Sequence, residues 1–218
     1  MGLGHSPRVV TDGLLYYLDA ANSRCYSGTG LTAFDLKGSV AGSLVNGVGF
    51  GTSNNGNFIF DGNDDYITFN TNTNITGVQS RTLCAWAKFN STTTSVVCGI
   101  GLPDFFQLFE IHAYQGKITG HRYGSEVIGT TTLSTGVWYH TAFSYDGATS
   151  KIYLNGILEN SKNETLSTAN TALTIGKKGY SANSNMNGFI SHVQLYNRAL
   201  SASEIRQLYN ATKGRYGL

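Results

Sequence analysis

The last third of the chain restricts the fold more than any other stretch. Residues 137–145, V-W-Y-H-T-A-F-S-Y, alternate between two sets of side chains, as a β-strand does. Asp146-Gly147 then marks a turn, and Asn155-Gly156 is a two-residue hairpin signal of type I′. Further strand-like runs follow at Leu173–Gly176 and Phe189–Tyr196. A twisted antiparallel sheet is therefore predicted.

A short helix is predicted after the last of these strands, from Ala202 to about Asn210. The sequence S-A-S-E that starts at Ser201 has the S-x-x-E spacing of a capping box, which marks a helix N-terminus. Apolar residues then recur at helical spacing at Ile205, Leu208 and Tyr209. This apolar stripe is expected to dock the helix on the sheet.

The rest of the chain has the same strand-and-turn pattern. Alternating runs occur at Leu14–Asp19, Asn57–Phe69, Arg81–Phe89, Ser95–Gly101, Phe105–Tyr114, Lys117–Tyr123, Glu126–Thr132 and Lys151–Leu154. Phe58 and Phe60 are expected to share one buried face. Gly, Ser, Thr and Asn are abundant, which suits many short strands and frequent turns. We predict an all-β fold: a two-sheet antiparallel jelly-roll sandwich with one short C-terminal helix.

One domain is predicted at residues 13–211, because 218 residues suit a single sandwich and no composition break interrupts the chain. Residues 1–12 are expected to form an extended arm and residues 212–218 a coil tail. Gly2–Asp12 and Thr212–Leu218 are the segments we expect to dock on a partner, because they are too polar and irregular to fold alone.

Charge and hydropathy argue against two classes of partner. The net charge is +2 without a basic run, so nucleic-acid binding is not expected. No apolar run reaches membrane-spanning length, and the N-terminus lacks the apolar segment of a signal peptide.

The chain has three cysteines: Cys25, Cys84 and Cys98. The last two lie in apolar runs and are expected to be buried thiols. A disulfide between Cys84 and Cys98 is the alternative, which requires their two strands to pair.

Five motifs in this order carry a family resemblance: F-D-G-N-D-D-Y-I, L-C-A-W-A-K-F, W-Y-H-T-A-F-S-Y-D-G, K-I-Y-L-N-G and V-Q-L-Y-N-R-A-L-S-A-S-E-I. They resemble a LamG-type domain of the concanavalin A-like lectin/glucanase superfamily, over about Asp12 to Tyr209. The resemblance implies the sandwich fold. It leaves the activity open, because the superfamily includes binding, structural and hydrolytic proteins.

The two ends carry a narrower resemblance. V-T-D-G-L-L-Y-Y-L-D-A-A-N-S-R-C-Y-S-G-T-G and Y-N-A-T-K-G-R-Y-G resemble small virion structural proteins of tailed bacteriophages. This implies a non-enzymatic protein displayed on the particle, foremost as head (capsid) decoration, located in the virion after assembly in the host cytoplasm. Its expected partners are other virion proteins and copies of itself. Two alternatives stay open: a tail or fibre adhesin that binds host surface glycan, and a glycoside hydrolase with an unrecognised site.

Catalysis is not predicted from the acidic residues. Hydrolases of the superfamily carry Glu-x-Asp-x-x-Glu or a one-residue-longer form, which places two carboxylates on one strand face. No catalytic residue is proposed and we expect no enzyme activity, because the glutamates of this chain are isolated from one another: Glu110, Glu126, Glu159, Glu164 and Glu204. The five histidines are spread singly, and zinc is not expected from their spacing.

Two weaker candidate sites remain, and no cofactor other than calcium is considered. Related folds hold Ca²⁺ through oxygen ligands, and one turn offers Asp61, Asn63, Asp64 and Asp65. The alternative is an ordinary polar hairpin turn. A glycan-binding site is predicted in the loop Gly179–Gly188, where an aromatic platform is followed by amides: Tyr180, Asn183 and Asn185. Its alternative is a variable surface loop.

Overall fold

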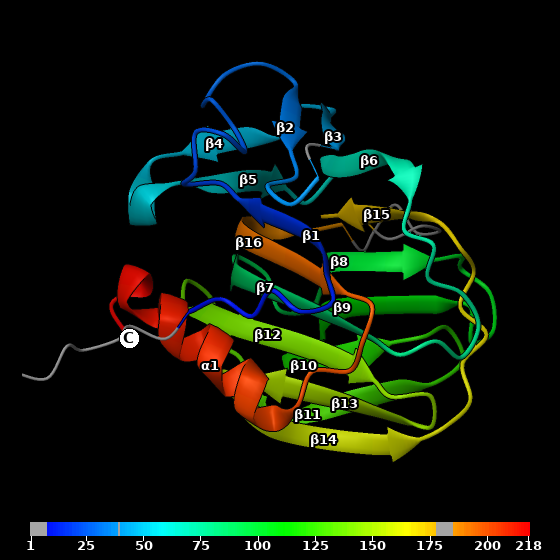
Figure 1. Ribbon diagram of the computed structural model, residues 1–218. Helices are drawn as coiled ribbons and strands as arrows, with labels where there is room; N and C mark the ends of the chain where they lie inside the picture. Colours follow the sequence, from blue (N-terminus) through cyan, green and yellow to red (C-terminus); the bar gives the residue numbers. More distant parts are fainter. Residues whose placement is uncertain (1–7, 39, 178–184) are drawn as a thin grey trace, which may run out of the picture.

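The protein is a sandwich of two antiparallel sheets. The computed structural model describes residues 8–38, 40–177 and 185–218. Their strands form two eight-stranded sheets, which we call sheet A and sheet B and which pack face to face (Figure 1). One α-helix, α1 (Ala202–Thr212), lies on the outer side of sheet A. The predicted fold class is thereby confirmed.

Sheet A has the strand order β14-β13-β12-β7-β16-β5-β4, with β1 also paired to β16. Its strands are β1 (Leu14–Asp19), β4 (Gly49–Gly51), β5 (Asn57–Asp61), β7 (Arg81–Phe89), β12 (Trp138–Tyr145), β13 (Thr149–Leu154), β14 (Ile157–Asn163) and β16 (Asn187–Tyr196). A 3₁₀ helix, η1 (Ser53–Asn55), precedes β5, and a second, η2 (Lys213–Tyr216), follows α1.

Sheet B has the order β11-β10-β9-β8-β15-β6-β3-β2. Its strands are β2 (Thr32–Phe34), β3 (Ala41–Val45), β6 (Tyr66–Asn72), β8 (Thr94–Gly101), β9 (Leu108–Tyr114), β10 (Lys117–His121), β11 (Glu126–Thr132) and β15 (Ala172–Ile175). The central strands β9, β8 and β15 thus lie between β11 and β10 on one side and β6, β3 and β2 on the other.

The core fills the space between the two sheets. Its centre includes Phe109 of β9 stacked on Phe143 of β12, with ring centroids 4.2 Å apart. Phe58 and Phe60 share the inner face of β5 as predicted, each 1% exposed. Burial of such aromatic side chains supplies most of the driving force for closing a sandwich.

The helix forms where its sequence signals place it. Ser201 Oγ accepts a hydrogen bond from the Glu204 backbone N–H, and the Glu204 carboxylate accepts one from the Ser201 backbone N–H, so the capping box is confirmed. Ile205 and Leu208 are buried in an apolar cluster with Tyr196 of β16. The predicted stripe therefore docks α1 on the outer face of sheet A.

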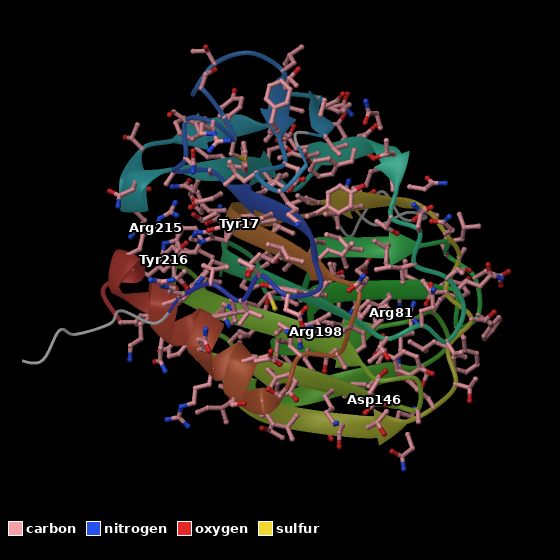
Figure 2. The ribbon with its side chains drawn as sticks, in the orientation of Figure 1. Tyr17, Arg81, Asp146, Arg198, Arg215 and Tyr216 are labelled. Atoms are coloured by element: carbon pink, nitrogen blue, oxygen red, sulfur yellow. The ribbon has the colours of Figure 1, made fainter. Side chains whose placement is uncertain are left out.

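The tail differs from the predicted coil at Lys213–Tyr216, which forms η2. The Tyr216 ring stacks on Trp86 of β7 at 4.0 Å, and its hydroxyl is 2.8 Å from His192 Nδ1 of β16. Arg215 lies beside Tyr216 (Figure 2). Its guanidinium donates to Asp19 Oδ1 at 2.7 Å. These contacts bury the tail against its own sheet, while docking of a partner by the two terminal segments stays a prediction.

The cysteines are free thiols, and all three are buried. Cys84 lies in β7 of sheet A among outer-face residues, whereas Cys98 lies in β8 of sheet B and faces the inner core. Their strands belong to different sheets and do not pair, so the Cys84–Cys98 disulfide is excluded. No helix in the described part of the chain has the length and apolar content to cross a membrane.

Trp138→Ala tests the contact between the tail and sheet A. Trp138 is 7% exposed, donates to Asn54 Oδ1 at 3.0 Å and packs 4.8 Å from the Tyr216 ring. Removing a buried aromatic side chain leaves a cavity, so the free energy of unfolding should fall by about 3–5 kcal/mol. Urea denaturation followed by circular dichroism measures this, with Val137→Ala as the exposed neighbour control. An unchanged midpoint would contradict the packing described.

Glu204→Gln tests the charge at the helix cap. The hydrogen bonds from Arg198, at 2.6 and 3.0 Å, lower the pKa of Glu204 from its ordinary 4.5 to about 2. A carboxyl with a depressed pKa in the folded state stabilises the protein above pH 4.5, and this contribution is lost as the pH falls towards 2. Denaturation of both proteins at pH 6 and pH 2.5 should therefore show a difference that shrinks in acid. A difference independent of pH would refute it.

Candidate functional site

A cavity of about 240 Å³ opens on the outer face of sheet B. It spans four adjacent strands, β6, β15, β8 and β9. Its polar lining comes from Tyr66, Glu110, Thr174 and Lys177. Tyr66, Glu110 and Thr174 alternate along their strands with core residues such as Ile67, so the pleat of the sheet directs them away from the core. Lys177 lies just after the end of β15.

Glycine residues on β8 create the hollow. A Cβ atom at Gly99 would lie 3.0 Å from the Glu110 Cβ on the neighbouring strand, and one at Gly101 would lie 2.0 Å from the Gln107 carbonyl oxygen. Both positions line the cavity. At its side, the Lys177 ammonium lies over the Tyr66 ring, 4.0 Å from the ring centroid. The result is a recess with an aromatic wall, an ammonium group and a carboxylate.

The turn between β9 and β10 fixes which residues stand beside Glu110. Gln115 and Gly116 both have positive φ, 50° and 74°, as in a two-residue hairpin turn of type I′. Tyr114 therefore pairs with Lys117, and the register carries through to Glu110 opposite His121. His112 occupies the same face of β9, two residues along.

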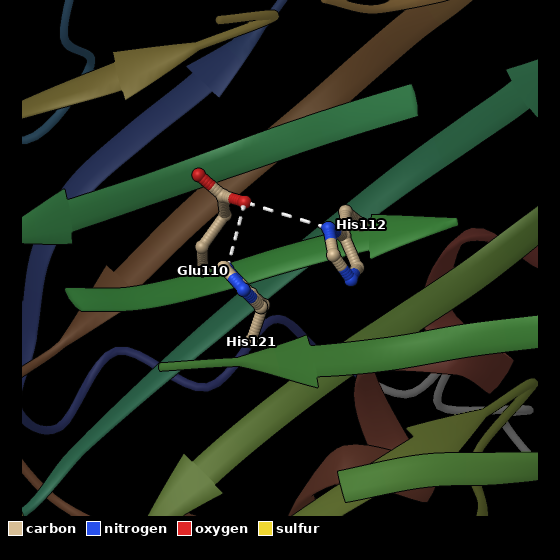
Figure 3. Close-up of side chains that lie close together, drawn as sticks. All are labelled: Glu110, His112 and His121. Carbon is tan, nitrogen blue, oxygen red and sulfur yellow. Dashed lines mark ion pairs between the residues drawn. The ribbon is translucent and has the colours of Figure 1, made fainter. Parts of the chain in front are cut away.

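The hairpin thus assembles a cluster of Glu110, His112 and His121, the Glu–His cluster (Figure 3). Glu110 Oε1 lies 3.6 Å from His112 Nδ1 and 3.7 Å from His121 Nδ1. The two imidazole rings stack with centroids 4.8 Å apart. All three residues are at most 6% exposed. Since Glu110 also lines the cavity, the cluster and the cavity form one site.

The spacing of the histidines along the sequence did not predict this cluster. A different feature of the sequence indicates part of it: Glu110 and His112 are two residues apart in one strand, so their side chains share a face of the sheet. Gln115-Gly116 then sets the hairpin register, which places His121 opposite Glu110. Combining the turn with the strand spacing would have brought the three residues together from the sequence.

The predicted calcium turn brings its carboxylates together. Ligand oxygens of Asp61, Asp64 and Asp65 lie within 4.8 Å of one another. Asp61 accepts hydrogen bonds from the backbone and side chain of Asn63, which lower its pKa. Burial raises the pKa of Asp65, whose Oδ2 accepts from the Asp61 N–H at 3.1 Å. The carboxylate oxygens of Asp61 and Asp65 thus accept hydrogen bonds from within the turn. Calcium binding stays a prediction.

The predicted glycan loop falls largely outside the described residues. Tyr180 and Asn183 both lie there. Asn185 is described and buried, and its side-chain amide donates to the backbone carbonyl of Asn63. Asn185 thereby joins the loop to the acidic turn, and glycan binding by these three residues stays a prediction.

The other two strand histidines, His140 and His192, lie on the outer face of sheet A beneath the C-terminal segment. His140 is edge-on to Trp86 at 5.5 Å, and burial lowers the pKa of this imidazole to about 3. Burial also lowers the pKa of His192, and this effect is larger than the opposite effect of the hydrogen bond between its ring and Asp19, which raises the pKa. Both rings are packed groups beneath the tail.

Carboxylates around the cavity are not arranged as in a glycosidase. Glycosidases place two carboxyl groups about 5–9.5 Å apart with free space between them for the sugar or water. Among the described lining residues Glu110 is the only carboxylate. Glu126 Oε1 lies 3.7 Å from His121 Nε2, so the His121 ring stands between the two carboxylates.

Comparison with known families identifies the superfamily of this chain. The family model Laminin_G_3, of the concanavalin A-like lectin/glucanases superfamily, matches residues 61–206, which is more than half of the chain. The match includes the cavity, the Glu–His cluster and the start of α1. No curated protein matches the chain in sequence.

Solved structures with the same fold include three of differing context. Domain 4 of AbnA, an extracellular arabinanase from Geobacillus stearothermophilus, was solved with arabinotriose; it aligns with TM-score 0.70 and 18% identity over 90% of this chain and 98% of that one. The binding domain of Paraclostridial Mosquitocidal Protein 1 aligns with TM-score 0.69 and 16% identity, over 91% of this chain and 52% of that one. Trypanosoma rangeli sialidase in complex with sialic acid aligns with TM-score 0.69 and 18% identity, over 95% of this chain and 34% of that one. The chain thus spans about half of the second protein and a third of the third.

Proposed function

We propose that this chain, which belongs to the Laminin_G_3 family of the concanavalin A-like lectin/glucanase superfamily, is a glycan-binding domain without catalytic activity. The observation that carries the proposal is the cavity on the outer face of sheet B. It combines the Tyr66 ring, on which a sugar can stack, with a carboxylate, a hydroxyl and an ammonium group that hydrogen-bond to sugar hydroxyls.

The size of the cavity indicates how much of a glycan it holds. About 240 Å³ is smaller than the 300–1,000 Å³ typical of pockets that enclose drug-sized ligands. One sugar unit, at the end of a chain or as a branch, therefore fits better than a long buried segment. The arabinotriose complex of the AbnA domain supports the use of this fold for oligosaccharides.

The absence of catalysis is proposed from the single carboxylate among the described lining residues. Acid/base and nucleophile roles in glycoside hydrolysis need two such groups around one bond. A panel of chromogenic oligosaccharides tests this directly. No turnover is expected from the wild-type protein, and turnover that disappears in Glu110→Gln would refute it.

Glycan binding is tested on a glycan array and then with Tyr66→Ala. For the glycan that binds best, loss of the Tyr66 ring should weaken the affinity about tenfold, or ~1.4 kcal/mol, because a stacking surface is removed. Isothermal titration calorimetry measures it. Ile157→Ala is the control, since Ile157 is exposed on β14 of sheet A. No binding by the wild-type protein, or equal affinity in Tyr66→Ala, would contradict the site.

A second candidate function is the virion structural role, foremost head decoration, that the ends of the sequence imply. The observation that favours it is an apolar loop at residues 102–106, where Leu102 is 50%, Phe105 64% and Phe106 37% exposed. Its backbone is fixed by hydrogen bonds from Phe106 N–H to Tyr123 and from Ser167 N–H to Phe106. Exposed apolar side chains on a fixed loop are typical of a protein contact surface.

Particle labelling separates the virion roles. An antibody against the chain should decorate phage heads in electron micrographs if it is a head decoration protein, and tails or fibres if it is an adhesin. The double variant Phe105→Ser, Phe106→Ser should be incorporated poorly, because the apolar contact is lost, while Ile157→Ser is the control at an exposed site on sheet A. Unlabelled particles, or normal incorporation of the double variant, would count against this role.

A further inference from the structure

We propose that the Glu–His cluster binds a divalent transition-metal ion, with Zn²⁺ as the best match. Glu110, His112 and His121 offer one carboxylate oxygen and two imidazole nitrogens that lie within 4.8 Å of one another. Imidazole nitrogen is a preferred ligand of Zn²⁺ and its neighbours in the first transition row, whereas Ca²⁺ and Mg²⁺ prefer oxygen alone. The donor set therefore differs in kind from that of the acidic turn.

Two of the three distances between the donors are close to those around a tetrahedral ion. With metal–ligand bonds of about 2.1 Å, two ligands of a tetrahedral zinc lie about 3.4 Å apart. The distances from Glu110 Oε1 to the two Nδ1 atoms, 3.6 and 3.7 Å, exceed this by only a few tenths of an ångström.

The strands hold these donors in place before any ion binds. Glu110 and His112 share β9, and His121 is fixed by the hairpin register of β10. Each is nearly fully buried, which restricts its rotamers. On the outer side, Glu126 Oε1 lies 3.7 Å from His121 Nε2, where a carboxylate orients a metal-bound imidazole in many zinc sites.

Three protein ligands leave a fourth position open, as in zinc sites that bind water or a substrate. Glu110 lines the cavity, so we assign this position to the cavity side. A water molecule or a hydroxyl of a bound ligand would occupy it there. Metal binding can be measured on the protein without glycan, so its test is separate from the test of glycan binding.

The test uses the full-length chain after removal of metal with EDTA and desalting. Titration with ZnCl₂ in a calorimeter should give one site per chain, and CoCl₂ should give the intense visible absorption of tetrahedral Co²⁺. His112→Gln and His121→Gln should each weaken Zn²⁺ binding by at least about 100-fold, because loss of a ligand exceeds the 10–100-fold cost of losing an outer-shell partner. Glu126→Gln should weaken it by about 10-fold.

Two controls make the result specific. His140→Gln removes a histidine on β12 of sheet A, and Asp61→Asn with Asp64→Asn disables the acidic turn; both should retain the Zn²⁺ site. Circular dichroism confirms that each variant is folded. The cobalt spectrum of the wild-type protein decides the matter even if a histidine variant fails to fold. No tetrahedral spectrum, or Zn²⁺ binding unchanged in folded His112→Gln, would overturn the proposal.

Discussion

The contact between the two sheets at Phe109, Phe143 and Gly120 is the constraint on which the rest of the structure depends. Phe109 stacks on Phe143 across the sandwich, and Phe143 also presses on β10, where a Cβ at Gly120 would lie 2.2 Å from its ring. Close packing of this kind tolerates little displacement. The core thereby fixes the position of β9 and β10 relative to sheet A.

The same contact positions the site on the opposite face. Phe109 precedes Glu110 and Gly120 precedes His121, so each inward residue is next in the chain to a member of the Glu–His cluster. Because alternate residues of a strand point to opposite faces, anchoring one residue in the core orients its neighbour outward. The cluster is thus held by the core behind it as well as by the hairpin register.

The faces that other elements leave uncovered support the binding site proposed on the outer face of sheet B. The inner faces of both sheets are packed together, and the outer face of sheet A is covered by α1 and by Tyr216 stacked on Trp86. The outer face of sheet B carries no helix in the described part of the chain. The cavity on this face holds polar groups where a ligand can reach them, and the strands on which they lie keep them in place.

Local signals in the sequence predicted most of the fold. The capping box at Ser201, the Asn155-Gly156 turn and the alternation of Arg81–Phe89 each encode their own structure within a few residues. Contacts between distant segments were not encoded in this way. The burial of Tyr216 against Trp86 joins residues 130 positions apart, and Phe105, expected in a strand, lies in an exposed turn before β9. The cavity likewise depends on how four strands adjoin, which no single stretch reveals.

The most direct test of the account is a map of the ligand-contacting surface in solution. Amide chemical shifts of ¹⁵N-labelled protein, followed by NMR during titration with the array-selected glycan, would give it residue by residue. The account predicts changes at Tyr66, Gly99, Glu110 and Thr174 on the outer face of sheet B. Changes confined to α1, η2 and sheet A would contradict it.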